Sequence, residues 1–303
     1  MTESVEASAP GRQMPLELRR SSLSRRRRIT DLVAVVAIFL CVAVAAVPVA
    51  LVVAYLVRQG AGVMSWEFLT ADMPRQAQTL GGGIGPAVVG TIVTVGFASL
   101  LAVPLGILGA IYLVEYGKQR PVARTIRAMA DIMTGVPSIM MGLFIYVSFV
   151  LVTQNLNALS ASLALACLML PLIIRTTEEM LNLVPDDLRH AGLALGARKW
   201  RTIISVVLPA AIPGITSGVL LAVARAAGET APIYLVIGLT YRANWSLFGP
   251  NTSLPAQIFK NAQEPFPAAN ERAWGAALTL VAIVFIFTVV GRFLANRFSS
   301  RER

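Results

Sequence analysis

Long stretches without a single charged side chain recur along the chain, separated by short polar segments. These stretches lie at 32–57, 76–114, 132–174, 202–224, 230–241 and 273–291. A membrane helix needs roughly 20 apolar residues, because a hydrocarbon layer about 30 Å thick is crossed at about 1.5 Å per residue. The stretch 132–174 is long enough for two such helices, and its polar residues Gln154, Asn155 and Asn157 suit a turn between them. The pattern therefore predicts six transmembrane helices, near 32–57, 88–114, 132–152, 158–175, 207–232 and 273–293.

The composition agrees with this pattern. Of the 303 residues, 56% are hydrophobic and only 14% are charged, and the mean hydropathy is +0.69. A soluble domain has about 25% charged residues with which to cover its surface. We therefore expect an all-α membrane protein whose apolar surface faces lipid.

The net charge of +10 is distributed unevenly between the two predicted sides of the membrane. If both termini are cytoplasmic, twenty basic residues lie on the cytoplasmic side and five on the exterior, with Arg225 alone inside a span. That asymmetry is the positive-inside pattern, and the opposite topology would invert it. The basic cluster Arg25–Arg28 then anchors a helix end at anionic headgroups, which argues against nucleic-acid binding.

The regions outside the spans divide the chain simply. We expect residues 1–29 to be a disordered basic cytoplasmic tail and residues 30–300 to be the transmembrane domain. The first apolar stretch is longer than the core of a typical signal peptide and follows a long polar leader, so we expect a retained membrane helix. The exterior loop near 242–272 suits an ordered cap, a docking surface for an external partner or a solvated connector.

Candidates for catalysis or metal binding are few. Cys41 and Cys167 both fall within predicted spans, and His190 is the single histidine, so no disulfide or transition-metal site is predicted. The chain has no Walker sequence and no nucleophile-base arrangement. We expect no cofactor and no enzymatic activity in this chain itself.

The predicted cytoplasmic loop 185–209 follows the fourth span. Pro185 and the two acidic residues after it are typical of a helix start, and Gly196 is typical of a helix end. Leu188, Ala191 and Leu195 give this short helix an apolar side. Its form suits either a plain surface helix or one that enters a groove on another protein.

Arg225 and Glu229 lie within the predicted fifth span, four residues apart, so they can pair on one helix face. An unpaired charge at a helix centre costs on the order of 3 kcal/mol. The two residues are a structural ion pair that locks the bundle, residues close to the outer interface, or a site on a translocation path. Arginine suits an oxyanion because its planar fork donates parallel hydrogen bonds and stays charged.

The spacing within 185–209 resembles the coupling loop of ABC importer permeases, in which Glu-Ala-Ala, three residues, Gly and nine residues precede Ile-x-Leu-Pro. Ala191 takes the first Ala position, Gly196 the Gly, Val206 the Ile, and Leu208 and Pro209 end the pattern. His190 replaces the usual Glu and Gly192 the second Ala. The resemblance implies that this loop enters a cleft of an ATP-binding subunit.

Arg225-Ala-Ala-Gly-Glu-Thr-Ala-Pro232 resembles the fifth span of the PstA family of phosphate-specific permeases. The likeness extends over about 80–295 and includes the further segments Gly82–Thr91, Thr134–Ser138, Leu170–Glu179 and Arg272–Ala277. It implies a type I ABC importer permease with the MetI-like fold, in a bacterial cytoplasmic membrane. The partners that it implies are a PstC-like second permease, a PstB-like ATP-binding dimer and a PstS-like phosphate-binding protein.

The resemblance assigns Arg225 and Glu229 to a phosphate path that works by alternating access. The resemblance also implies a phosphate role for Arg175, which falls in the segment matching the family's fourth span. Its position at the cytoplasmic end of a predicted helix instead favours an arginine that anchors this helix end at the lipid headgroups. Asp131 is expected to be an interfacial residue or a helix N-cap. The alternatives are a permease for another oxyanion, such as sulfate or molybdate, and a secondary anion transporter that would not need loop 185–209. A membrane-embedded enzyme is disfavoured because the spans lack His or Asp clusters.

Overall fold

The computed structural model describes residues 25–118 and 120–299, and these are all helix, turn or loop without a β-strand. The helices are α1 (Arg25–Gly60), α2 (Trp66–Thr70), α3 (Gly85–Ile111), α4 (Pro121–Gly135), α5 (Ser138–Ile145), α6 (Leu151–Thr153), α7 (Ala158–Asn182), α8 (Asp186–Ala194), α9 (Lys199–Thr202), α10 (Leu208–Gly228), α11 (Ala231–Val236), α12 (Leu254–Ala262) and α13 (Pro267–Ser299). A short 3₁₀ turn, Ala61–Val63, follows α1, and π-helical segments at Tyr112–Tyr116, Tyr146–Val150 and Ile203–Val207 extend α3, join α5 to α6 and join α9 to α10. The predicted all-α class is confirmed.

The chain forms two units, residues 1–54 and 55–303. Most of α1 lies in the first unit, and this helix includes Arg25–Ile29 of the predicted tail, whose remaining residues lie outside the described part of the chain. The second unit contains every other helix. The last turn of α1 belongs to that unit, where Tyr55 packs edge-on against Trp274 of α13.

Five continuous helices in the described residues are long and apolar enough to cross a membrane. They run over Ile29–Val63, Gly85–Tyr116, Ala158–Asn182, Lys199–Gly228 and Pro267–Phe293. The pair Pro121–Gly135 and Ser138–Thr153, bent by 108° at its break, makes a sixth if the two helices count as one span. The prediction of six spans agrees with this reading.

The third span is not the straight helix predicted at 132–152. It begins as α4 at Pro121 and breaks after Gly135, where Val136 is extended with φ −75° and ψ 132°. The next residue, Pro137, has no backbone N–H and disfavours helical backbone in the residue before it. Asp131 consequently lies inside α4, whose N-cap is Arg120, so the N-cap alternative for Asp131 is wrong and the interfacial alternative stays a prediction.

The fifth span also differs from its prediction at 207–232. The helix starts earlier, at Lys199, and ends at Gly228, and the following Glu229 is extended with φ −71° and ψ 129°. A new helix, α11, begins at Ala231 with Pro232 in its first turn, where a missing N–H costs nothing. Glu229 is therefore the C-cap of α10 and does not continue its helical face.

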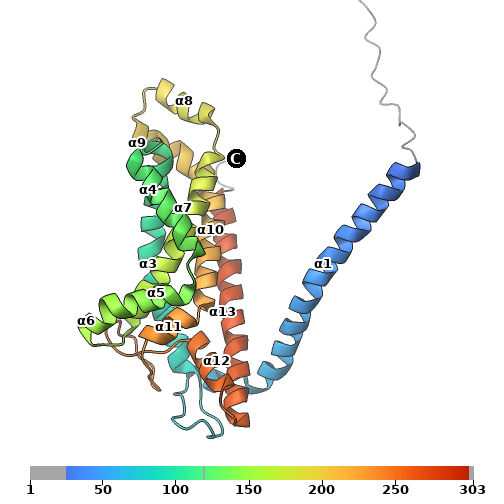
Figure 1. The fold of residues 1–303 in the computed structure, drawn as a ribbon, viewed down its shortest axis with the longest axis vertical. Coiled ribbons are helices and arrows are strands. Elements are labelled where there is room, and N and C mark those ends of the chain that lie inside the picture. The colour runs from blue at the N-terminus through green and yellow to red at the C-terminus, as the bar shows by residue number, and fades with distance from the viewer. Residues whose placement is uncertain (1–24, 119, 300–303) are drawn as a thin grey trace, which may run out of the picture. The chain divides into compact units, whose positions relative to one another are not determined.

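Helix α7 is central to the second unit, where it packs against α3, α10, α4, α5 and α11. Small residues allow the α3–α7 contact: a Cβ added at Gly106 of α3 would lie 2.6 Å from a methyl carbon of Ile173. The principal buried cluster contains Ala98 and Ala102 of α3 with Leu165 and Met169 of α7. Figure 1 shows α3, α7, α10 and α13 running together along the length of this unit.

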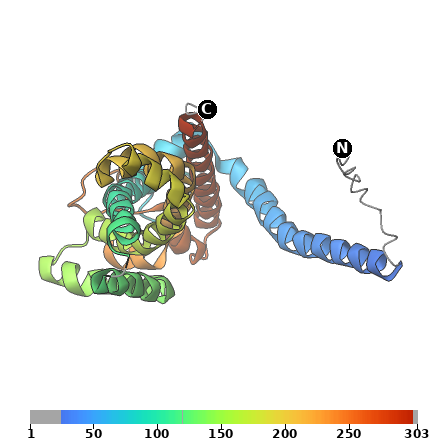
Figure 2. The same cartoon turned by 90° about the horizontal axis from the view of Figure 1, so that it is seen from above.

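The two ends of the bundle carry different short elements. Helices α8 and α9 lie at one end and α12 at the other, with α5, α6 and α11 crossing the bundle between the levels of α4 and α12 (Figure 1). Figure 2, seen from above, shows the green α5–α6 arm at the edge of the bundle. By the charge asymmetry, α8 and α9 are predicted to lie on the cytoplasmic side.

The second half of the 242–272 loop is an ordered cap. Asn251, Thr252 and Ser253 are fully buried, and the N–H of Leu254 donates to the Thr91 hydroxyl on α3 at 2.8 Å. Gly90, on the same helix, leaves room for the backbone carbonyl of Thr252. The tip of the loop is exposed, including Trp245 and Phe248.

Candidate functional site

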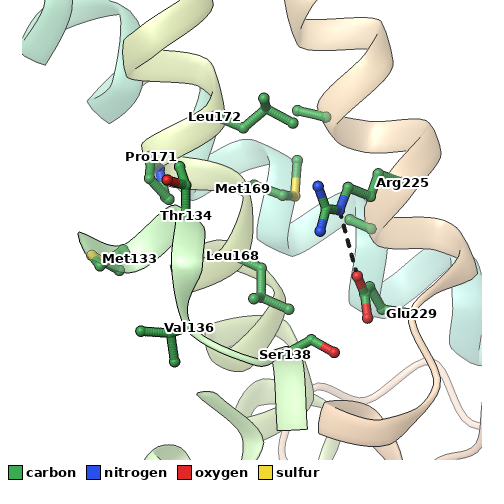
Figure 3. Close-up of a pocket in the computed structure, with 12 residues that line it drawn as sticks. Met133, Thr134, Val136, Ser138, Leu168, Met169, Pro171, Leu172, Arg225 and Glu229 are labelled. Carbon is green, nitrogen blue, oxygen red and sulfur yellow. Dashed lines mark ion pairs between the residues drawn. The ribbon is translucent and has the colours of Figure 1, made fainter. Parts of the chain in front are cut away.

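A cavity of about 160 Å³ lies where α4 breaks into α5. The helices α4 and α5 form one wall, α7 a second, and the last turn of α10 the third (Figure 3). Its lining residues are Met133, Thr134, Val136, Ser138, Leu168, Met169, Pro171, Leu172, Ala222, Arg225, Ala226 and Glu229. Arg225 and Glu229 supply the only ionisable side chains of this lining.

Arg225 extends from α10 into the space between that helix and α7 (Figure 3). Its side chain is 68% exposed, whereas the Glu229 side chain is 17% exposed. The Arg225 Nε lies 3.6 Å from the Glu229 Oε1, which is longer than a normal hydrogen bond. The predicted pairing is therefore present, but it is loose and leaves the outer nitrogens of the guanidinium open to the cavity.

Two hydroxyl groups line the opposite wall at the break. Thr134 donates to the carbonyl of Asp131 at 2.7 Å, so its proton is already committed. Ser138 is the first residue of α5, and its hydroxyl points toward the α10 side of the cavity (Figure 3). In the sequence Ser138 stands out only as part of the segment Thr134–Ser138 that carries a family resemblance. The break at Pro137 places it in the same cavity lining as Arg225.

Arg175 lies outside this cavity, on α7. It pairs with Asp131 of α4 and lies 3.7 Å from the Glu178 carboxylate. Glu178 in turn accepts from the Nε of Arg127 at 2.6 Å. Opposite charges on α4 and α7 thus meet, and Arg175 takes part in this contact between the two helices. Its role as a headgroup anchor stays a prediction.

The predicted coupling loop folds as a short projecting helix, α8, followed by a turn. Pro185 is its N-cap residue and Asp186 its first residue. Gly196 adopts φ +81°, and the N–H groups of Gly196 and Ala197 donate to the carbonyls of Leu193 and Gly192. These two bonds form a Schellman motif, which glycine favours at this position. The predicted start and end of the helix are both confirmed.

The residues of the coupling pattern take different positions around α8. His190, Ala191 and Gly196 are exposed, and Gly192 is partly buried. A Cβ added at Gly192 would lie 2.6 Å from the Thr202 side chain, so a small residue is needed there. Leu208 and Pro209 open α10, both partly buried.

Apolar side chains remain uncovered on the projecting segment. Leu188 and Leu193 are each more than two-fifths exposed, and Leu195 is 90% exposed. Among the described residues no other element covers this apolar end of α8. Such a surface is typical of a helix that docks on another protein.

Neither a metal centre nor a disulfide is formed within residues 25–118 and 120–299. No group of three or more His, Cys, Asp or Glu side chains there is arranged to hold a metal ion, and Cys41 and Cys167 are free thiols.

A bundle of long apolar helices with a projecting helix at one end and an ionisable pair in a cavity is typical of a multi-pass membrane transport protein. Residues 102–303 match the family model described as "Binding-protein-dependent transport system inner membrane component", and the chain belongs to that family. Its relatives within the family are phosphate transport system permease proteins named PstA. The relative from Mycobacterium leprae (strain TN) is 41% identical over 91% of this chain and 92% of its own length. The relative from Yersinia pestis is 39% identical over 78% and 80%.

Solved structures support the fold. A structure of the MetNI methionine ABC transporter in an inward-facing conformation matches with a TM-score of 0.54, at 19% identity over 71% of this chain and 94% of that one. A bacterial ABC transporter involved in the import of the acidic polysaccharide alginate matches with a TM-score of 0.51, at 12% identity over 70% and 78%. The predicted type I, MetI-like ABC permease fold is confirmed.

Proposed function

We propose that this chain is the membrane permease subunit of an ATP-driven importer of inorganic phosphate, and that Arg225 binds the anion on its path. The observation that carries the site is the exposed guanidinium of Arg225, which extends into the cavity between α4–α5, α7 and α10. The PstA relatives, 41% identical over 91% of the chain, support phosphate as the substrate.

The loose contact with Glu229 suits reversible binding. A charge left unpaired in a membrane helix costs on the order of 3 kcal/mol, so Arg225 needs a partner when the path is empty. A close, bidentate partner would compete strongly with phosphate, whereas a single 3.6 Å contact competes weakly. Glu229 thus keeps the empty site neutral without blocking it.

The break between α4 and α5 adds two further groups suited to an anion. The hydroxyl of Ser138 reaches the cavity, and the first N–H groups of α5 lie beside it. Unpaired N–H groups at a helix start carry partial positive charge. Ser138 and the start of α5 therefore complement Arg225 from the opposite wall.

The coupling segment and the family membership suggest the other subunits of the importer. The exposed end of α8 docks into an ATP-binding dimer of the PstB type, which binds and hydrolyses ATP. A PstC-like permease completes the path, and a PstS-like protein delivers phosphate to the end that carries α12. Closure of the ATP-binding dimer moves α8 and exchanges access to the cavity from one side of the membrane to the other.

The test is uptake of radiolabelled phosphate in cells that lack this chain. The cells receive wild type, Arg225→Ala or Arg225→Lys, each with and without the ATP-binding subunit. We expect full uptake only with wild type, and none without the ATP-binding subunit. The Arg225→Ala variant should fall to background, and Arg225→Lys should retain a small fraction, because lysine keeps the charge but not the planar fork.

The remaining outcomes separate the competing functions. Uptake that persists without the ATP-binding subunit would identify a secondary transporter. Uptake of sulfate or molybdate in place of phosphate would identify a permease for another oxyanion. Full uptake by Arg225→Ala, with the protein present at wild-type amount, would remove Arg225 from the path.

A further inference from the structure

Three helix ends meet at the side chain of Arg189, in the first half of α8. Its Nε donates to the Oε1 of Glu115, in the π-helical end of α3, at 3.0 Å. Its Nη1 and Nη2 donate to the carbonyls of Val184 and Leu181, at the end of α7, at 2.6 and 2.7 Å. One guanidinium therefore binds α8 to both α3 and α7.

The Glu115–Arg189 pair is shielded from water. The side chain of Glu115 is 4% exposed and that of Arg189 is 12% exposed. Arg189 also lies 3.1 Å from Asp186, but that carboxylate is 67% exposed. Removing one member of a buried pair leaves an uncompensated charge, whereas an exposed pair contributes little. Glu115 is therefore the partner that holds Arg189, and Asp186 is not.

A second basic residue, Lys199, attaches the segment that follows the Gly196 turn to the same end of α3. The ammonium of Lys199, at the start of α9, donates to the backbone carbonyl of Glu115 and lies 4.8 Å from the centre of the Tyr116 ring. The chain is thus held before and after Gly196. The apolar end of α8, Leu193–Leu195, projects between these two attachments.

Helix α7 continues from this attachment to the cavity. Leu181 lies near its last residue, while Leu168, Met169 and Leu172 of the same helix line the wall opposite Arg225. Pro171 lies inside α7 without ending it, since the helix runs from Ala158 to Asn182. A displacement at the Arg189 end therefore reaches the cavity through one continuous helix.

We propose that Arg189 and Glu115 form the positioning pair that transmits movement of the docked α8 to α3 and α7, and so to the phosphate cavity. This inference rests on the proposed function, because it assumes that α8 docks on an ATP-binding subunit. Neither residue touches phosphate or ATP. Without the pair, α8 still docks, but its movement is no longer passed to the bundle.

The experiment uses the complete importer reconstituted in proteoliposomes. The phosphate-binding protein is added outside and ATP is enclosed inside, so that transport carries phosphate into the vesicles. Two rates are measured for each variant: ATP hydrolysis and phosphate uptake. The variants are Arg189→Met and Glu115→Gln. The matched control is Asp186→Asn, which removes the exposed carboxylate from the same guanidinium.

We expect Arg189→Met and Glu115→Gln to assemble with the ATP-binding subunit and to hydrolyse ATP. The ATP consumed per phosphate transported should rise about tenfold, within the usual range of coupling between two sites. Asp186→Asn should keep the wild-type ratio. Parallel loss of hydrolysis and uptake at an unchanged ratio would show a purely structural role and overturn the proposal.

A second measurement, made on the assembled importer, does not depend on phosphate transport. Spin labels at Leu183→Cys, at the end of α7, and Leu195→Cys report the distance between α7 and α8, with Cys41 and Cys167 replaced by alanine. In the wild-type background the distance should be the same without nucleotide and with trapped ATP. In Arg189→Met, or in Arg189→Lys if that variant alone is stable, the distance distribution should broaden. An unchanged distance distribution would overturn the proposal that Arg189 and Glu115 hold α8 to α7. This conclusion would stand even if phosphate proved not to be the substrate.

Discussion

The arginines of the second unit differ in how firmly they are held. Arg272 is 4% exposed, and its Nη atoms donate to the carbonyls of Ala77, Thr79 and Gly81. Arg225 has only a 3.6 Å contact with Glu229. The sequence singled out Arg225 because it interrupts an apolar run. It gave no sign of Arg189, whose partner Glu115 lies 74 residues away.

The hydroxyl of Ser138 provides a prediction at this scale. Ser138→Ala should raise the KM for phosphate about fivefold with little change in maximal uptake, because one hydrogen bond contributes about 1 kcal/mol. Phosphate uptake over a range of concentrations measures both constants.

The control for that substitution lies further along the same arm. Ser148 donates to the carbonyl of Phe144 at 2.6 Å and is absent from the cavity lining. Ser148→Ala should leave KM unchanged. An equal change in both variants would show that Ser138 acts on the arm and not on phosphate.

At the scale of elements, proline positions show where sequence reasoning succeeds and where it fails. Pro185 and Gly196 bound α8 as predicted, because caps and left-handed turns are decided by a few neighbouring residues. Pro104, Pro171 and Pro213 remain inside α3, α7 and α10, whereas the chain breaks before Pro137. Whether a membrane helix survives a proline depends on neighbouring helices that the sequence does not place.

The turn that ends α8 gives the prediction at this scale. Nothing lies within 4 Å of a Cβ added at Gly196, so only its φ of +81° restricts substitution. Asparagine tolerates this backbone, and a β-branched residue does not. Gly196→Asn should therefore keep the ATP-binding subunit bound, and Gly196→Val should lose it or lower its affinity about tenfold or more, consistent with strain of about 1–2 kcal/mol.

Co-purification and titration of the ATP-binding subunit against the solubilised permease measure this effect. Equal binding by the asparagine and valine variants would mean that the conformation of the turn is not needed for docking.

At the scale of the whole molecule, the helical class and the number of spans could be predicted because they depend only on apolar length and composition. The contacts between spans could not, because they depend on pairs such as Gly106 and Ile173 that lie far apart in sequence. The cavity forms because α4 and α10 both end at a break and both pack on α7. The packing joins segments that lie far apart in the sequence.

The predicted orientation can be tested across the whole bundle. Leu183 at the α8 end and Trp245 at the α12 end are both strongly exposed. The test uses a background in which Cys41 and Cys167 are replaced by alanine. In spheroplasts with an intact cytoplasmic membrane, Trp245→Cys should react with a membrane-impermeant thiol reagent. Leu183→Cys should react only in inverted vesicles, because the positive-inside asymmetry places that end in the cytoplasm. The reverse result would invert the topology.

The two short helices that follow the breaks are in contact with each other. A Cβ added at Gly142 of α5 would lie 2.5 Å from the Cα of Pro232 in α11, so the two backbones meet without a side chain between them. Close-packed backbones leave no room for one helix to slide while the other stays in place. On the proposed path we therefore expect α5 and α11, two distant parts of the chain, to act as a single barrier between the cavity and the α12 end. Such a barrier opens as a whole or stays shut, so the site is expected to change access in one step, without a partly open state that would let ions leak past the bound anion.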